Sequence, residues 1–135
     1  MKLCDTSVLV DVDRGDVENR VKRLDDEGRH AISAVTATEL RLGVNIRHDG
    51  DDRGEPIESL DRLFDRFRTI DVDREVAIAA GDVISTLRRS GTSLNDLHDV
   101  YIAATAKTNQ LPVLTANVDH FNRIDDVEVI DWRTY

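Results

Sequence analysis

Short apolar runs alternate with amphipathic helical segments along the whole chain, and this alternation limits the folds that the chain can adopt. Strands are predicted at residues 2–4, 30–33, 69–72, 112–115 and 128–130. Helices are predicted at residues 6–12, 17–27, 35–47, 56–67, 74–90 and 98–109, with a charged loop at 48–55. This pattern predicts an α/β fold in which helices cover a mostly parallel sheet of four to five short strands. The 135 residues suit a single domain, 1–135.

The chain carries 27 acidic and 18 basic residues, which gives a formal net charge of −9. Lysine occurs only at positions 2, 22 and 107, whereas aspartate is spread over nearly every polar segment. Nucleic acid held by bulk charge usually requires a basic surface, so this mode of binding is not expected. A dispersed acidic surface is typical of a salt-adapted protein, because at ~1 M salt the Debye length is only ~3 Å. We therefore expect a halophilic origin.

The single cysteine, Cys4, stands in an apolar strand. One cysteine excludes an intramolecular disulfide framework and a cysteine-based zinc cluster, and it favours a reducing cytoplasm. Asp5 interrupts the apolar N-terminal run, which argues against a signal peptide. No segment approaches the ~20 apolar residues of a membrane span, so no membrane partner is expected.

Polar residues directly follow two of the predicted strands. Asp5 follows the first strand, and Asn117 and Asp119 follow the fourth. Parallel sheets place their ligand sites outside the carboxyl ends of the strands, so these residues are candidates for a functional site. Taken alone, Asp5 could instead cap the helix that begins with Thr6 and Ser7.

Two further acids fall on apolar helical faces. Glu39 shares a stripe with Val35, Leu42 and Ile46, and Asp99 shares a face with Ile102, Ala103 and Ala106. An acid on such a face is rarely left alone in a core. The alternatives are that Glu39 reaches water from the edge of the stripe, and that Asp99 complements the helix dipole. Asp96, one turn before Asp99, is either a second ligand or part of a capping pair with Ser93.

Together these acids predict a metal site. Carboxylates held close together need a counter-ion, and hard oxygen ligands suit Mg²⁺ or Mn²⁺ in a site that acts on phosphate. No His and Cys set has the spacing of a zinc site. The histidines at 30, 48, 98 and 120 are expected to be solvated or structural.

Four segments, in order, resemble the PIN-domain ribonucleases, and within them the VapC-type toxins of toxin–antitoxin pairs. They read LCDTSVLVD, TATELRLG, NDLHDVYIAATA and LPVLTANVDHF, and the likeness covers nearly the whole chain. The resemblance implies a three-layer α/β/α fold and a Mg²⁺- or Mn²⁺-dependent endoribonuclease that cuts tRNA or rRNA in the cytoplasm. It also implies a homodimer and a VapB-like antitoxin that blocks the acidic site.

Matched position by position, the resemblance implies that Asp5, Glu39 and Asp99 are the metal ligands, with Thr6 and Ser7 supporting the first acid. Similar chains often carry an acid directly before the phenylalanine, but here that residue is His120. Either Asp119, as a fourth catalytic acid, or Asn117 could complete the site, with Asp96 in support. The open alternative is a PIN-like domain that binds RNA or a protein without cutting.

Overall fold

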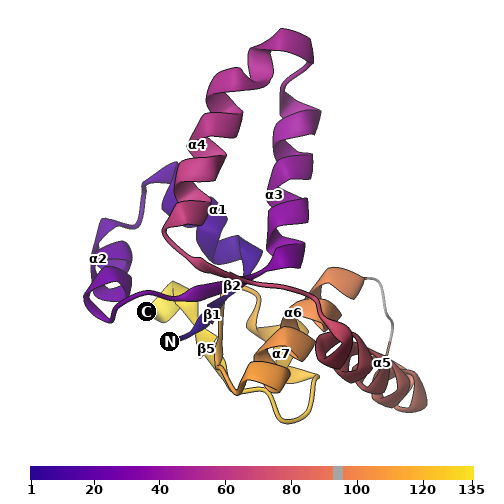
Figure 1. Cartoon of the computed structure of the whole chain (residues 1–135). Coiled ribbons are helices and arrows are strands. Elements are labelled where there is room, and N and C mark those ends of the chain that lie inside the picture. The colour runs from indigo at the N-terminus through magenta and orange to yellow at the C-terminus, as the bar shows by residue number, and fades with distance from the viewer. Residues whose placement is uncertain (93–95) are drawn as a thin grey trace.

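The computed structural model describes residues 1–92 and 96–135, and within them five parallel strands form one sheet in the order β3-β2-β1-β4-β5 (Figure 1). The strands are β1 Leu3–Cys4, β2 Ala31–Ser33, β3 Arg68–Ile70, β4 Val113–Thr115 and β5 Val129–Asp131. All five pair in parallel, so every strand ends at the same edge of the sheet. The predicted fold class is confirmed.

Helices precede or follow every strand. They are α1 Thr6–Arg14, α2 Glu18–Asp26, α3 Ala34–Arg47, α4 Gly54–Asp65, α5 Arg74–Arg89, α6 Leu97–Asn109 and α7 Val118–Asn122, with the short 3₁₀ helices η1 Gly50–Arg53 and η2 Trp132–Thr134. Gly15 and Gly91, at φ +87° and +75°, end α1 and α5 in the left-handed conformation that glycine adopts most easily. No helix of this described part is long and apolar enough to cross a membrane.

Successive strand residues point to opposite faces of the sheet and build two cores. One core lies under α5, α6 and α7 and receives Leu3, Ala31 and Val113 from the strands. The other lies under α1 to α4 and η2 and receives Cys4, Ile32 and Leu114. The sheet is therefore the middle of three layers, and its three central strands, β1, β2 and β4, are buried on both faces.

α3 and α4 form a hairpin that projects away from the sheet (Figure 1). The predicted inward stripe of α3 is wrong at its outer end, where Leu42 and Ile46 are 51% and 71% exposed. Beyond the sheet edge α3 packs mainly against α4, and it turns the buried Val44 toward that helix. The base of α3, which carries Glu39, stays next to the sheet.

Three short helical elements were not predicted from the sequence. Residues 48–55 form η1 and the start of α4 where a loop was predicted, and α7 and η2 were not predicted at all. A helix of one turn has too few positions to show a 3.6-residue period. α7 is positioned by one buried side chain, Phe121, and that anchor fixes the residue before it.

Candidate functional site

Asp5 is buried at the carboxyl end of β1, with 3% of its surface exposed. The hydroxyls of Ser7 and Thr115 both donate to its Oδ2, each at 2.8 Å. Ser7 Oγ also accepts the amide of Ala116 at 3.1 Å, which fastens the end of β4 to the start of α1. Asp5 stands at the N-cap position of α1 but its side chain makes no capping hydrogen bond, so the helix-cap alternative is wrong. Its carboxylate instead faces the sheet edge.

Glu39 reaches the same edge from α3. This helix follows β2 without a loop, and Ser33 caps it by accepting the amide of Val35 at 3.1 Å. The Thr6 hydroxyl donates to Glu39 Oε1 at 2.8 Å and lies 3.1 Å from the Thr36 hydroxyl. Burial raises the pKa of the Glu39 carboxyl. The first turn of α1 thus holds both Asp5 and Glu39, through two consecutive hydroxyl residues.

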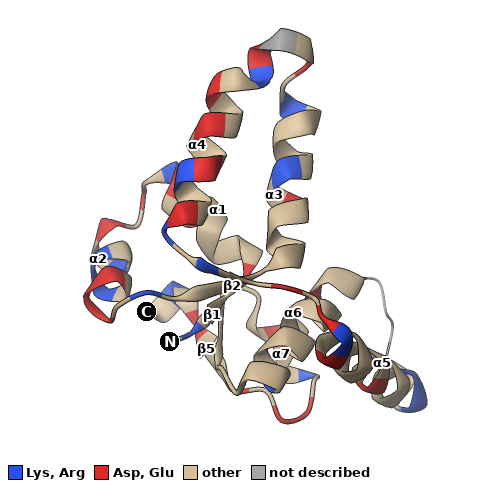
Figure 2. Cartoon of the chain, viewed as in Figure 1, with Lys and Arg blue, Asp and Glu red and all other residues tan. Residues whose placement is uncertain are grey.

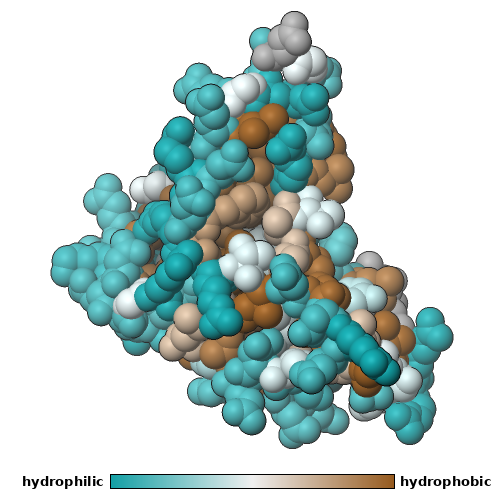
Figure 3. Space-filling view, in the orientation of Figure 1, coloured by the Kyte–Doolittle hydropathy of each residue, from teal (hydrophilic) through white to brown (hydrophobic). Residues whose placement is uncertain are grey.

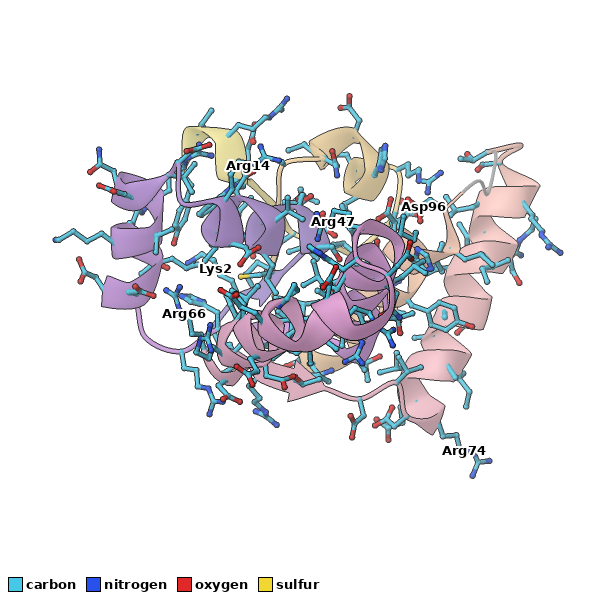
Figure 4. The ribbon with its side chains drawn as sticks, turned by 90° about the horizontal axis from the view of Figure 1, so that it is seen from above. Lys2, Arg14, Arg47, Arg66, Arg74 and Asp96 are labelled. Atoms are coloured by element: carbon cyan, nitrogen blue, oxygen red, sulfur yellow. The ribbon has the colours of Figure 1, made fainter. Side chains whose placement is uncertain are left out.

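Asp99 comes from the first turn of α6 and is 6% exposed. Burial, followed by the negative charge of Asp96, raises the pKa of Asp99 to about 6. Asp96 begins the helix without a side-chain capping bond, and it lies on the side of the α3–α4 hairpin that faces α5 (Figure 4). Ser93, its predicted capping partner, lies outside the described residues. Asp99 is therefore a buried acid beside a second acid.

Two histidines border these acids. His120 Nδ1 lies 2.8 Å from Asp99 Oδ2, and His98 Nδ1 lies 3.7 Å from both Glu39 Oε2 and Asp96 Oδ1. Asp96, Asp99 and His120 each offer a ligand atom, and these atoms lie within 4.8 Å of one another. Both imidazoles are about half exposed, at 51% and 53% of the side chain. The sequence predicted solvated or structural histidines, and these two instead contact the acids.

The charge around the site is unbalanced. Within the described ranges, the ion pairs of Glu39, Asp96 and Asp99 involve histidine and neither lysine nor arginine. Buried carboxylates without a permanent cation are costly, and the raised pKa of Asp99 expresses that cost. A donor set of several carboxylate oxygens, with hydroxyls that orient them, fits a hard divalent cation. The residues present therefore suit Mg²⁺ or Mn²⁺.

Two other predicted site residues, Asn117 and Asp119, make no described contact with the acids. Both residues are exposed. The amide of Asn117 donates to Thr115 Oγ1 at 2.9 Å, so this residue shapes the turn after β4.

Four site residues were missed, namely Thr36, Thr115, His98 and His120. Thr115 carried a usable signal, because it is a polar residue that ends an otherwise apolar strand one position before the turn. His120 carried another, because it stands where similar chains have an acid. The contacts of Thr36 with Thr6 and of His98 with Glu39 form only where α1, α3 and α6 meet at one edge.

A separate hollow of about 370 Å³ lies between α1, α3 and α4. Its walls include the apolar side chains Val10, Leu40, Val44, Leu60 and Leu63. Arg14 and Arg47 line it as well (Figure 4). Figure 3 shows apolar residues between α3 and α4 on a surface that is otherwise largely hydrophilic. Asp13 and His48 also line it, so the groove combines apolar side chains with charged ones of both signs.

Comparison with known proteins identifies relatives of the whole chain. Residues 2–127 match the family model of the PIN domain. Ribonuclease VapC1 of Methanocaldococcus jannaschii is 30% identical over 125 residues, which cover 92% of this chain and 81% of that protein. A tRNA(fMet)-specific endonuclease VapC of Salmonella typhimurium is 30% identical over 104 residues, 77% and 76% of the two chains. The structure is also similar to DNA-bound VapBC of Salmonella typhimurium, with a TM-score of 0.86, 26% identity, and 98% and 99% of the chains covered.

Proposed function

The chain belongs to the PIN domain family and, within it, to the VapC ribonucleases, and we propose that it is an endoribonuclease toxin neutralised by a VapB-like antitoxin. One observation carries the proposal. Asp5, Glu39 and Asp99 come from three segments far apart in the sequence, yet hydroxyls of the first turn of α1 donate to Asp5 and Glu39. Glu39 also lies 3.7 Å from His98, in the turn of α6 that carries Asp99, and the charge of Asp5 contributes to the raised pKa of Asp99. Such a cluster has no evident structural use. We infer that the enzyme acts in the cytoplasm, where its RNA substrate is found.

We assign Asp5, Glu39 and Asp99 as ligands of Mg²⁺ or Mn²⁺. The oxygen-rich donor set and the absence of a lysine or arginine partner among the described ion pairs support this assignment. When bound, such an ion activates a water molecule and neutralises charge on the phosphate oxygens.

The protein's own groups prepare the site for this ion. Ser7 and Thr115 both donate to Asp5 Oδ2, so they fix the orientation of its carboxylate. Thr6 does the same for Glu39 through Oε1. Asp96 is proposed as a further ligand of the ion, because its ligand atom lies within 4.8 Å of that of Asp99. Asn117 and Asp119 are proposed to hold water or RNA, since both are exposed directly after β4.

Cleavage of RNA by the purified protein in potassium chloride tests the proposal, with Mn²⁺ or with a chelator. We expect discrete fragments that require metal and are lost in both Asp5→Asn and Asp99→Asn, by at least about 10²-fold. Asp61→Asn, an exposed acid on α4, is the matched control and should cut like wild type. A folded wild type that binds Mn²⁺ and RNA but never cuts would favour the non-cutting alternative. Cleavage that survives both site substitutions would refute the assignment of the acids.

We propose tRNA as the RNA class, because a relative of 30% identity bears the name of a tRNA-specific endonuclease. Unfractionated tRNA and purified ribosomal RNA, cut in parallel, separate this proposal from the ribosomal alternative. Faster cleavage of ribosomal RNA would overturn it.

We propose that the antitoxin places an amphipathic, acidic segment in the groove between α1, α3 and α4. The apolar walls suit the apolar face of such a segment, and the two arginines Arg14 and Arg47, which outnumber the one lining acid Asp13, suit its acidic side chains. With a co-expressed antitoxin, Leu60→Glu should abolish complex formation, whereas Asp61→Asn should leave it unchanged. A complex that survives Leu60→Glu, with a normal dissociation constant, would exclude the groove.

We further propose a homodimer and a salt-adapted chain. The exposed Leu42 and Ile46 lie one turn apart on α3 and offer an uncovered apolar stripe to a second copy. Light scattering should give a dimer for wild type and a monomer for Ile46→Glu.

Acidic residues are spread over α2, α4 and α5 (Figure 2), which supports salt adaptation. The melting temperature should then rise steadily between about 0.1 and 2 M potassium chloride, beyond the range in which the Debye length changes much.

A further inference from the structure

His120 takes the position in which similar chains often have an acid. It precedes Phe121, which is fully buried beneath α7. The amide of His120 donates to the carbonyl of Asn117 at 3.1 Å, so the backbone of this short helix is also fixed. An anchored backbone sets the direction of the side chain, although the imidazole itself is 53% exposed. The residue is therefore placed by the core and yet open to a ligand.

The imidazole meets two acids from another element. Its Nδ1 lies 2.8 Å from Asp99 Oδ2, and ligand atoms of Asp96, Asp99 and His120 lie within 4.8 Å of one another. In an octahedral site with bonds of about 2.1 Å, ligand atoms are separated by about 3 to 4.2 Å. Small side-chain rotations would bring all three donors to one ion.

We propose that His120, together with Asp96 and Asp99, binds the divalent ion of this site and makes the site prefer Mn²⁺ to Mg²⁺. The inference rests on the proposed nuclease only in that the ion is the one used for RNA cleavage. Binding itself is a separate property of these three side chains.

The preference follows from the chemistry of the donor. Mg²⁺ is small and hard, takes oxygen ligands and retains several waters, so an imidazole nitrogen contributes little to its binding. Imidazole is a common ligand of transition-metal ions, whose affinity for nitrogen exceeds that of Mg²⁺. A carboxylate at position 120 would instead give an all-oxygen set, which serves both ions. His120 alone thus distinguishes this site from one with a carboxylate at position 120, in which all ligands would be oxygen atoms.

Mn²⁺ titration of the chelator-stripped protein, followed by electron paramagnetic resonance, tests the inference, with Mg²⁺ as the competitor. The ratio of the Mg²⁺ and Mn²⁺ dissociation constants should fall about tenfold or more in both His120→Ala and His120→Asp. His120→Asp should do so by binding Mg²⁺ more tightly. Asn122→Asp adds the same negative charge at an exposed position of α7 and should leave the ratio unchanged.

Pulsed resonance of the bound Mn²⁺ gives a second readout. Wild type should show modulation from an imidazole nitrogen, and both His120 variants should lose it. An unchanged ratio in His120→Ala, no nitrogen modulation in wild type, or no Mn²⁺ binding by wild type would each overturn the inference.

The same samples, assayed for RNA cleavage, distinguish this inference from the proposed function. Nitrogen-ligated Mn²⁺ in a protein that cuts no RNA leaves the inference standing and removes the function. If instead the protein cuts RNA and its Mn²⁺ affinity is the same in wild type and both His120 variants, the proposed function stands and the inference is refuted.

Discussion

Asp99→Asn should make the metal-free protein more stable, although it removes a proposed ligand. The wild-type carboxyl is 6% exposed, and burial and Asp96 raise its pKa from 3.8 to about 6. At about 1.36 kcal/mol per unit of pKa, the ionised side chain costs up to about 3 kcal/mol at pH 7.5. The variant also loses the contact with His120 Nδ1, which reduces its gain in stability by about 1 kcal/mol. The expected net gain is about 1 to 2 kcal/mol, or about 3 to 7 °C in melting temperature.

The pH dependence of this gain has a definite sign. A raised carboxyl pKa means that the folded state binds the proton more tightly than the unfolded state does, so the stability due to Asp99 is present below about pH 4 and is lost as the pH rises through about 6. The advantage of Asp99→Asn should therefore be small at pH 4.5 and full at pH 7.5.

Thermal melts in chelator and in Mn²⁺ provide the assay. At a concentration 100 times the dissociation constant, Mn²⁺ should stabilise wild type by about 2.7 kcal/mol and the variant by much less, so the order of the two melting temperatures reverses. Asp61→Asn controls for the loss of one exposed charge. A variant that melts below wild type in chelator at pH 7.5 would refute the electrostatic reasoning.

Three other substitutions test separate contacts. Thr115→Val keeps the side-chain shape but removes the hydroxyl that donates to Asp5 Oδ2; Mn²⁺ affinity by calorimetry should fall about tenfold. Burial lowers the pKa of His30, which accepts the Lys2 amide, so stability should decline as the pH falls below about 6.5; in urea titrations from pH 7 to 5, His30→Gln should flatten that decline. Trp132→Ala, at a fully buried position, should lower the free energy of unfolding by about 3 to 5 kcal/mol.

The α/β fold was accessible from the sequence because strands and helices differ in period, and each long helix shows its period over several turns. β1, β2 and β4 are apolar on both faces, so they read as buried parallel strands. α7 has five residues and one buried side chain, too few for a pattern. The position of the exposed Leu42 depends on where α3 leaves the sheet, and periodicity does not carry that information.

The sequence indicated some residues of the candidate site but not their partners. Asp5 could be placed at a strand end, and Glu39 and Asp99 drew notice as acids on apolar helical faces. The partners of these acids come from elsewhere in the chain: Thr115 is 110 residues from Asp5, and His120 is 21 residues from Asp99. Such pairs form only when parallel strands bring their ends to one edge.

By itself, the sequence determined the order of the main elements and the parallel sheet covered by helices, and it marked Asp5, Glu39 and Asp99 as candidate site acids. These follow from local composition and period, which each segment carries within itself. Only the tertiary structure decided that hydroxyls of α1 and β4 orient Asp5, that Asp119 stays exposed, and that His120 contacts Asp99. Contacts of this kind depend on the packing of α1, α3, α6 and α7 around one edge, and no single segment encodes the distance to another.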